Sequence, residues 1–162
     1  MEVRRLQKLE EDARSACNSS KMWDEFVLQH ELGTIHQLSC WGRFQEKVPS
    51  RGKYWILVVE EGGVIVGGTM LVRFRLPFGL CWLYACRGPV LEYLDSAGLE
   101  VIVDEAKKIA RQEKALFMRI DPPLQQGGVR MKGMRGVEGF QPEQTLMVEL
   151  REGESAILAQ MK

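Results

Sequence analysis

The middle of the chain carries the pattern that most constrains the fold. The run Tyr54–Val59 is apolar on both faces of a strand, which is typical of a strand in the interior of a sheet. A hairpin turn is predicted at Glu60-Glu61-Gly62-Gly63, because glycine tolerates positive φ. A long second strand over Val64–Leu76 and a third over Leu80–Ala85 follow, with Pro77-Phe78-Gly79 turning the chain between them. These segments predict a three-stranded antiparallel meander.

Helical periodicity flanks this meander on both sides. A helix is predicted over Ser20–Glu31, with Ser20 as its N-cap and Gly33 as its stop signal. A second, shorter helix is predicted over Ser39–Lys47. After the meander, apolar residues repeat at helical spacing over Asp95–Glu113, which indicates one buried stripe.

Two further strands and a last helix complete the predicted order. The strands are Ala115–Ile120 and Thr145–Leu150, the glycine-rich segment Gln125–Glu138 between them is a predicted loop, and a helix starts at Glu154. An antiparallel meander followed by a crossover helix and more strands predicts an α/β fold of the mixed α+β kind. This order resembles the GNAT-type acyltransferase fold. The predicted division is one domain over 1–150 and the start of a further helix over 151–162.

Composition argues against several classes of function. Lys plus Arg and Asp plus Glu are 22 each, so the net charge is zero. A neutral chain is a poor candidate for binding nucleic acid or a membrane surface by itself. No stretch approaches the roughly 18 apolar residues of a membrane span, and no secretion signal is visible, so the cytoplasm is the expected compartment. The scattered cysteines and histidines predict reduced thiols and no metal site.

Two predicted strand ends carry charged residues, and strand ends are where ligand groups collect in open sheets. Arg87, at the end of the meander, could hold a phosphate or carboxylate, or it could pair structurally with Asp121 or Glu92. Arg119 and Asp121 end the next strand and share one sheet face. Asp121 could orient an attacking amine or accept its proton, or it could be a buried partner of an arginine.

The second predicted helix is a further candidate region. Arg43 and Lys47 lie four residues apart and share a face that suits a phosphate-bearing ligand. The alternative is a core Trp41 and Phe44 with solvated charges opposite. Gln125–Arg130 is the nearest match to a loop that would cradle the pyrophosphate of CoA, but no helix clearly follows it, which favours a flexible surface loop.

Several short motifs follow one another in a defined order across about residues 22–162. They are Trp23–Val27, Gln37–Gly42, Arg87–Val90 after the meander, Phe117–Pro122, Gly139-Phe140, and Gln141–Thr145 leading to Val148–Leu150. Together they resemble the Fem family of aminoacyl-tRNA-dependent transferases, which build the peptidoglycan interpeptide bridge. The resemblance implies transfer of an amino acid from aminoacyl-tRNA, the donor substrate, to the stem peptide of a lipid-linked or nucleotide-linked precursor, without metal or other cofactor.

The resemblance also implies roles for individual residues. In the family, the segment after the motif's tryptophan, here Trp41, supplies a basic contact to precursor phosphates. The matching position here is Gln45, so Arg43 or Lys47 would have to substitute. Asp121 matches the Asp of the family's Arg-x-Asp-Pro motif and is the expected catalytic residue. The expected substrate-binding residues are Trp41, Arg43, Gln45, Lys47, Arg87 and Arg119.

Family members have two GNAT-like domains, and the resemblance covers the first. A second domain, with tRNA contacts, would begin at the helix of residues 151–162. We therefore expect a cell-wall aminoacyltransferase or its N-terminal half, in the cytoplasm or at the inner face of the cell membrane. One alternative is a non-catalytic half that binds a precursor or partner chain, with an exposed apolar patch near Leu150–Met161. Another is a small-molecule GNAT N-acetyltransferase.

Overall fold

A computed structural model describes residues 2–6, 13–91, 96–122, 133–142, 151 and 153–160. The helices are α1 (Ala13–Gln29), α2 (Ser39–Glu46), α3 (Ser96–Glu113) and α4 (Glu154–Gln160), with 3-10 turns η1 (Ile35–Gln37) and η2 (Pro77–Gly79). The strands are β1 (Glu2–Leu6), β2 (Tyr54–Glu61), β3 (Val64–Arg75), β4 (Cys81–Cys86), β5 (Val90–Leu91) and β6 (Ala115–Asp121). None of the described helices is both long and apolar enough to cross a membrane.

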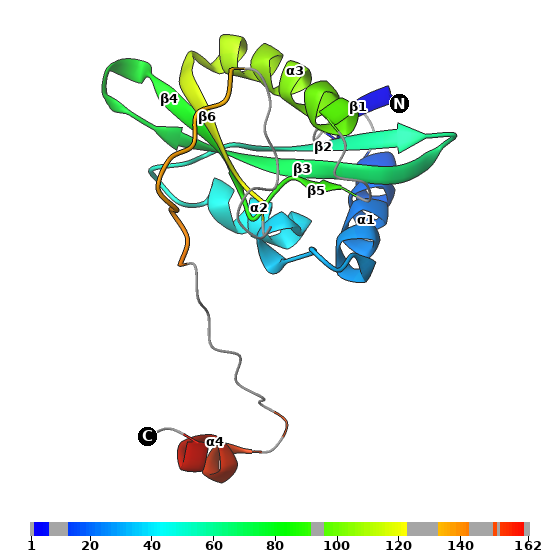
Figure 1. The fold of residues 1–162 in the computed structure, drawn as a ribbon, viewed down its shortest axis with the longest axis vertical. Helices are drawn as coiled ribbons and strands as arrows, with labels where there is room; N and C mark the ends of the chain where they lie inside the picture. Colours follow the sequence, from blue (N-terminus) through cyan, green and yellow to red (C-terminus); the bar gives the residue numbers. More distant parts are fainter. Residues whose placement is uncertain are drawn as a thin grey trace.

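The described strands form one mixed sheet in the order β1-β2-β3-β4-β6, with β5 paired to β3 (Figure 1). Strands β2, β3 and β4 are successive antiparallel neighbours, so the predicted meander is confirmed. Because β1 pairs with the other edge of β2, the apolar strand Tyr54–Glu61 is internal, as its sequence predicts. Helix α3 carries the chain across to β6, which pairs in parallel with β4.

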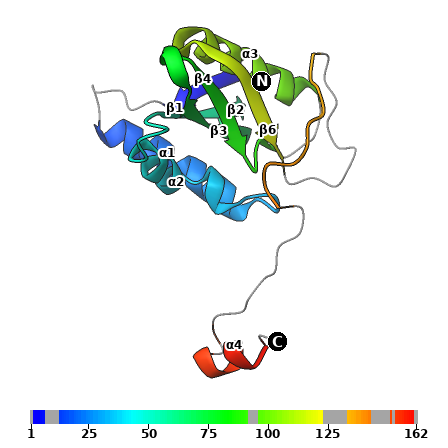
Figure 2. The ribbon, with the colours of Figure 1, turned by 90° about the vertical axis from the view of Figure 1, so that its left-hand side faces the viewer.

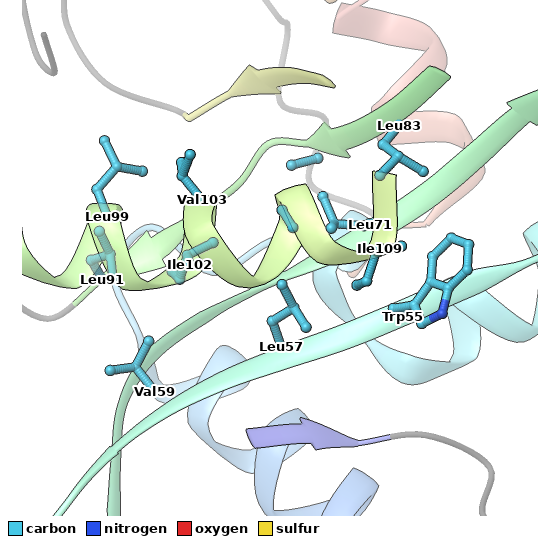
Figure 3. Close-up of a cluster of buried hydrophobic side chains, with 12 residues drawn as sticks. Trp55, Leu57, Val59, Leu71, Leu83, Leu91, Leu99, Ile102, Val103 and Ile109 are labelled. Carbon is cyan, nitrogen blue, oxygen red and sulfur yellow. The ribbon is translucent and has the colours of Figure 1, made fainter. Parts of the chain in front are cut away.

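Helices cover both faces of this sheet. Figure 2 shows α3 on one face and α1 with α2 on the other. On the α3 face, the helix side chains Leu99, Ile102 and Ile109 pack against Leu57 and Leu71 of the sheet (Figure 3). Side chains alternate along β2, so the neighbours of Leu57 point to the opposite face.

The second core lies on that opposite face. Trp23 and Val27 of α1 pack there against Ile56 and Val58 of β2 and Met70 of β3. Each fully buried side chain of this kind contributes roughly 1.5–3 kcal/mol through removal of apolar surface from water. The sheet is therefore held between two separate apolar layers.

Helix α1 begins earlier than predicted. It starts at Ala13, so the predicted N-cap at Ser20 is wrong, and Ser20 lies inside the helix. The residues from Ala13 to Ser20 include good helix formers and neither glycine nor proline, so the helix can extend back beyond the predicted start. After the helix, a Cβ on Gly33 would lie 1.7 Å from the carbonyl oxygen of Val27. A glycine is therefore required at this point, as the predicted stop signal implies.

Some of the remaining predicted elements are present in the structure, and others lie outside the described residues. The helices at 39–47 and 95–113 correspond to α2 and α3, and a helix does begin at Glu154. Helix α4 lies away from the sheet in both views of the ribbon (Figures 1 and 2). The strand predicted over 145–150, the segment 125–130 and Glu92 lie outside the described residues.

Candidate functional site at the ends of β4 and β6

The parallel pairing of β4 with β6 brings two of the predicted site regions together. Cys86, the last residue of β4, lies opposite Asp121, the last residue of β6. The chain then turns through Arg87, and the backbone N–H of Asp121 donates to the carbonyl of Gly88 over 3.1 Å. Arg87 has φ of +51°, a left-handed conformation that costs a non-glycine residue about 1–3 kcal/mol. The Gly88-Pro89 peptide bond is cis.

The carboxylate of Asp121 is bonded to a buried tyrosine. The Tyr84 hydroxyl donates to Oδ2 of Asp121 over 3.1 Å, and Nε2 of Gln141 donates to the same hydroxyl oxygen over 3.4 Å. Burial raises the pKa of Tyr84, so its hydroxyl keeps its proton at neutral pH. Burial also raises the pKa of the neighbouring Cys86 thiol, which makes it a poor nucleophile.

Two predicted arginines bind the segment that carries Gln141. Arg87 Nη2 donates to the carbonyl of Pro142 over 2.9 Å, and Arg119 Nη2 donates to the carbonyl of Glu138. The guanidinium of Arg119 also lies over the Phe140 ring, 5.3 Å from its centroid. Among the ion pairs of the described residues, none joins either arginine to Asp121. In this structure both guanidinium groups therefore hold residues 138–142 beside the two strand ends.

His36 is a residue of this region that the sequence reasoning missed. Its ring meets the edge of Trp41 with centroids 4.9 Å apart. Burial, and then the positive charge of Arg87, lower the pKa of His36, while the negative charge of Asp121 opposes this shift. Its Nδ1 is buried without a hydrogen-bond partner among the described residues. Its position directly before the Gln37–Gly42 motif is the one sequence signal that could have drawn attention to it.

Gln37 explains why the motif that begins with it lies here. Its fully buried side chain donates from Nε2 to the carbonyl of Cys86 over 2.6 Å and accepts from the backbone N–H of Met70 over 2.7 Å. The indole of Trp23 donates to its backbone carbonyl over 2.7 Å. Gln37 thus joins η1 to β3 and β4, which sets His36 and the start of α2 next to the Arg87 turn.

The predicted site residues of α2 differ in their surroundings. Trp41 is half-buried between His36 and Phe44, whereas Gln45 is buried. Arg43 is exposed and donates from Nη1 to the Ser39 hydroxyl over 3.0 Å. Lys47 is exposed at the C-cap of the helix. The structure thus links Trp41 to the Asp121 region through His36, while Arg43 is bonded within its own helix.

A cavity of about 780 Å³ lies beside β6, between α3 and residues 133–137. Its walls combine apolar side chains such as Val103, Met118 and Met134 with the cations Lys107 and Arg135. Of the predicted site residues, Arg119 lines it. In the part of the chain that the structure describes, no three His, Cys, Asp or Glu side chains gather as a metal-binding group.

The sheet, its crossover helix and the strand-end site define an acyltransferase fold of the GNAT type. A probable acetyltransferase of known structure has the same fold, with a TM-score of 0.50 over 92% of this chain and 99% of that chain, at 17% identity. The crystal structure of FemX is more similar, with a TM-score of 0.61 and 28% identity over 67% of this chain and 27% of that chain.

The model of the FemAB family matches residues 19–152, so the chain belongs to the FemAB family. The lipid II:glycine glycyltransferase of Staphylococcus haemolyticus is 36% identical over 104 residues, which are 63% of this chain and 24% of that protein. The enzyme of the same name from Staphylococcus epidermidis is 31% identical over 121 residues, or 72% of this chain and 28% of that protein. The chain spans about a quarter of the length of these relatives, and the family resemblance predicted from its motifs is confirmed.

Proposed function

We propose that this chain is an aminoacyltransferase of peptidoglycan synthesis, or the first domain of one, that moves an amino acid from aminoacyl-tRNA to the stem peptide of a precursor. The observation that supports it most is the Asp121 carboxylate fixed at the paired ends of β4 and β6. The relatives' name, lipid II:glycine glycyltransferase, supports a lipid-linked acceptor. That acceptor would be met at the cytoplasmic face of the membrane.

The proposed reaction replaces an ester with an amide. The amine nitrogen of the stem peptide attacks the carbonyl carbon of the aminoacyl ester. The new C–N bond forms as the C–O bond to the tRNA ribose breaks. The amine loses a proton, and the released ribose oxygen gains one, so the step needs neither an oxidant nor a cofactor. Asp121 orients the amine and accepts its proton, and Tyr84 already occupies Oδ2, so Oδ1 is the oxygen proposed to face the amine.

Positive charge on the exposed side of α2 and at the turn beside Asp121 is the basis for the proposed precursor contacts. Arg43 and Lys47 are exposed on α2, and Arg87 lies at the turn beside Asp121. Lipid-linked and nucleotide-linked precursors both carry phosphates, which these side chains would bind. Buried Gln45 and half-buried Trp41 would support this surface from within α2, and Arg119 would bind the precursor from β6. Contacts with tRNA would come mainly from a second GNAT-like domain or a partner chain.

A transfer assay tests the proposal and yields its first prediction. The chain is incubated with individual aminoacyl-tRNAs and a lipid-linked or nucleotide-linked precursor, and the mass of the precursor is measured. We expect an increase by one amino-acid residue. Asp121→Asn should lower the rate at least about 100-fold, because general acid–base groups contribute about 10²–10⁴-fold. A matched control is Asp104→Asn, on the exposed face of α3.

The other outcomes identify the alternative functions. A chain that binds the precursor saturably but transfers nothing with any aminoacyl-tRNA would be a non-catalytic precursor-binding half. Saturable binding of acetyl-CoA, with acetylation of a small amine, would instead indicate a GNAT N-acetyltransferase.

A further inference from the structure

The Tyr84 hydroxyl lies at the centre of a short hydrogen-bond chain. It contacts Gln141 on one side and Asp121 on the other, at 3.4 and 3.1 Å. Its ring is held by aromatic neighbours at centroid distances of 5.9 Å (Phe74), 5.6 Å (Trp82) and 5.4 Å (Phe140). The side chain is 2% exposed, so ring and hydroxyl have little freedom to move. Tyr84 lies in a predicted strand and carries no predicted role.

The direction of donation along this chain is fixed by chemistry. An amide nitrogen can only donate, and an ionised carboxylate can only accept. The Tyr84 oxygen therefore accepts from Gln141 and donates to Oδ2 of Asp121, while the Cys86 thiol lies within hydrogen-bonding reach of the same hydroxyl. Hydrogen bonds arranged head to tail in this way polarise and strengthen each other.

A carboxylate at a strand end needs such a restraint. The terminal torsion of an Asp side chain is broad, so its two oxygens exchange places readily unless something distinguishes them. The backbone of Asp121 is anchored by its N–H bond to the carbonyl of Gly88. Tyr84 supplies this restraint on the side chain, because its hydroxyl donates to one of the two oxygens and so distinguishes them.

We propose that Tyr84 is a positioning residue for Asp121: its hydroxyl, itself oriented by Gln141, fixes the carboxylate with Oδ1 toward the acceptor amine. This inference rests on the proposed function of Asp121 and adds a residue to it. Tyr84 itself touches no substrate and neither forms nor breaks a covalent bond. Arg87 and Arg119 contribute indirectly, because their bonds to Pro142 and Glu138 keep Gln141 above the hydroxyl.

The first test measures the hydrogen bond without any turnover. The chain has three tyrosines, so ¹³C labelling of the ring carbon that bears the hydroxyl gives a simple spectrum. Tyr84→Phe assigns the Tyr84 resonance by removing it. In Asp121→Ala we expect this resonance to shift while that of Tyr54 stays in place. An unchanged Tyr84 resonance would overturn the proposal.

The second test uses the transfer assay. Tyr84→Phe keeps the ring within its aromatic cluster and removes only the hydroxyl. We expect a fall in kcat of about tenfold, with the KM for aminoacyl-tRNA unchanged, since a misaligned carboxylate affects the chemical step. Tyr54→Phe is the matched control. Tyr54 packs against Gly42 of α2 and is not part of the hydrogen-bond chain of Gln141, Tyr84 and Asp121, so this variant should leave kcat unchanged.

A double variant separates positioning from simple packing. If Tyr84 acts through Asp121, Tyr84→Phe should cause no further loss in an Asp121→Asn background. Additive losses, or full kcat in Tyr84→Phe alone, would overturn the positioning role. If the wild-type chain transfers nothing, either alone or as part of a longer chain with a second GNAT-like domain, the proposed function is overturned instead. The carbon resonance would still decide whether Tyr84 holds Asp121.

Discussion

Asp121, Arg87 and Arg119 illustrate what single residues in a sequence can indicate. Their positions at strand ends are sufficient to propose a site, and Arg119 and Asp121 are two residues apart in one strand. Their partners are not predictable from the sequence. Tyr84 reaches Asp121 because β4 and β6 pair in parallel, and the arginines bind residues 138–142, which follow a long segment with no strand pattern.

His36 allows a prediction about pH at the residue scale. Its pKa is lowered in the folded chain, mainly by burial, so below the ordinary pKa of about 6.5 the unfolded chain binds more protons than the folded one. Stability should therefore fall as the pH drops through and below that value, and this contribution should vanish in His36→Gln. The urea midpoint at pH 7.5 and pH 5.5 measures the effect, with His30→Gln as control. An equal loss in wild type and His36→Gln would contradict the prediction.

At the scale of elements, close backbone approaches decide how the helices and strands meet. The Gly67-Gly68 pair predicts a bulge or a close approach, and the structure shows both. The register of β2 with β3 shifts between Val59, which pairs with Gly67, and Glu60, which pairs with Ile65. A Cβ on Gly67 would lie 2.6 Å from Leu91 Cδ2, and one on Gly68 would lie 2.4 Å from the Leu57 carbonyl oxygen and 2.6 Å from the Trp23 ring. Strand β5, which the sequence did not predict, pairs at this point because only glycine leaves it room.

Gly68→Ala should therefore be strongly destabilising. The added methyl group meets backbone and a fully buried indole, neither of which can move aside cheaply. We expect a loss of about 1–3 kcal/mol in the free energy of unfolding, the usual cost of overpacking. Gly136→Ala is the control, because nothing lies within 4 Å of the added Cβ there. Chemical denaturation of both variants checks the prediction, and equal stabilities would contradict it.

The whole molecule depends on one sheet that is buried on both faces. The apolar core under α3 and the apolar core under α1 share strands β2 and β3. Leu57 and Leu71 belong to the first core, and Ile56 and Met70 belong to the second. Loss of either layer exposes the same strands to water. The described domain is therefore expected to unfold as one cooperative unit.

Ile102→Ala tests this coupling between the layers. Ile102 is 1% exposed on α3, and its truncation should cost about 2–5 kcal/mol of unfolding free energy. Because the cores share strands, circular dichroism and tryptophan fluorescence, to which Trp23 on the opposite face contributes, should report the same lowered midpoint. Leu28→Ala, at a side chain 72% exposed on α1, should change stability by about 0.5 kcal/mol or less. Two separate transitions in Ile102→Ala would contradict the shared-sheet account.

The sequence by itself determined the meander, the buried stripe of α3, the mixed α+β class and the family, because apolar periodicity, glycine turns and ordered motifs are local properties. Only the tertiary structure decided how β5 pairs and which groups surround Asp121. Those features depend on residues far apart in the chain, such as Tyr84 and Gln141 or Gln37 and Cys86, whose contacts exist once the sheet has formed. Long-range pairing of this kind leaves no periodic trace in the sequence.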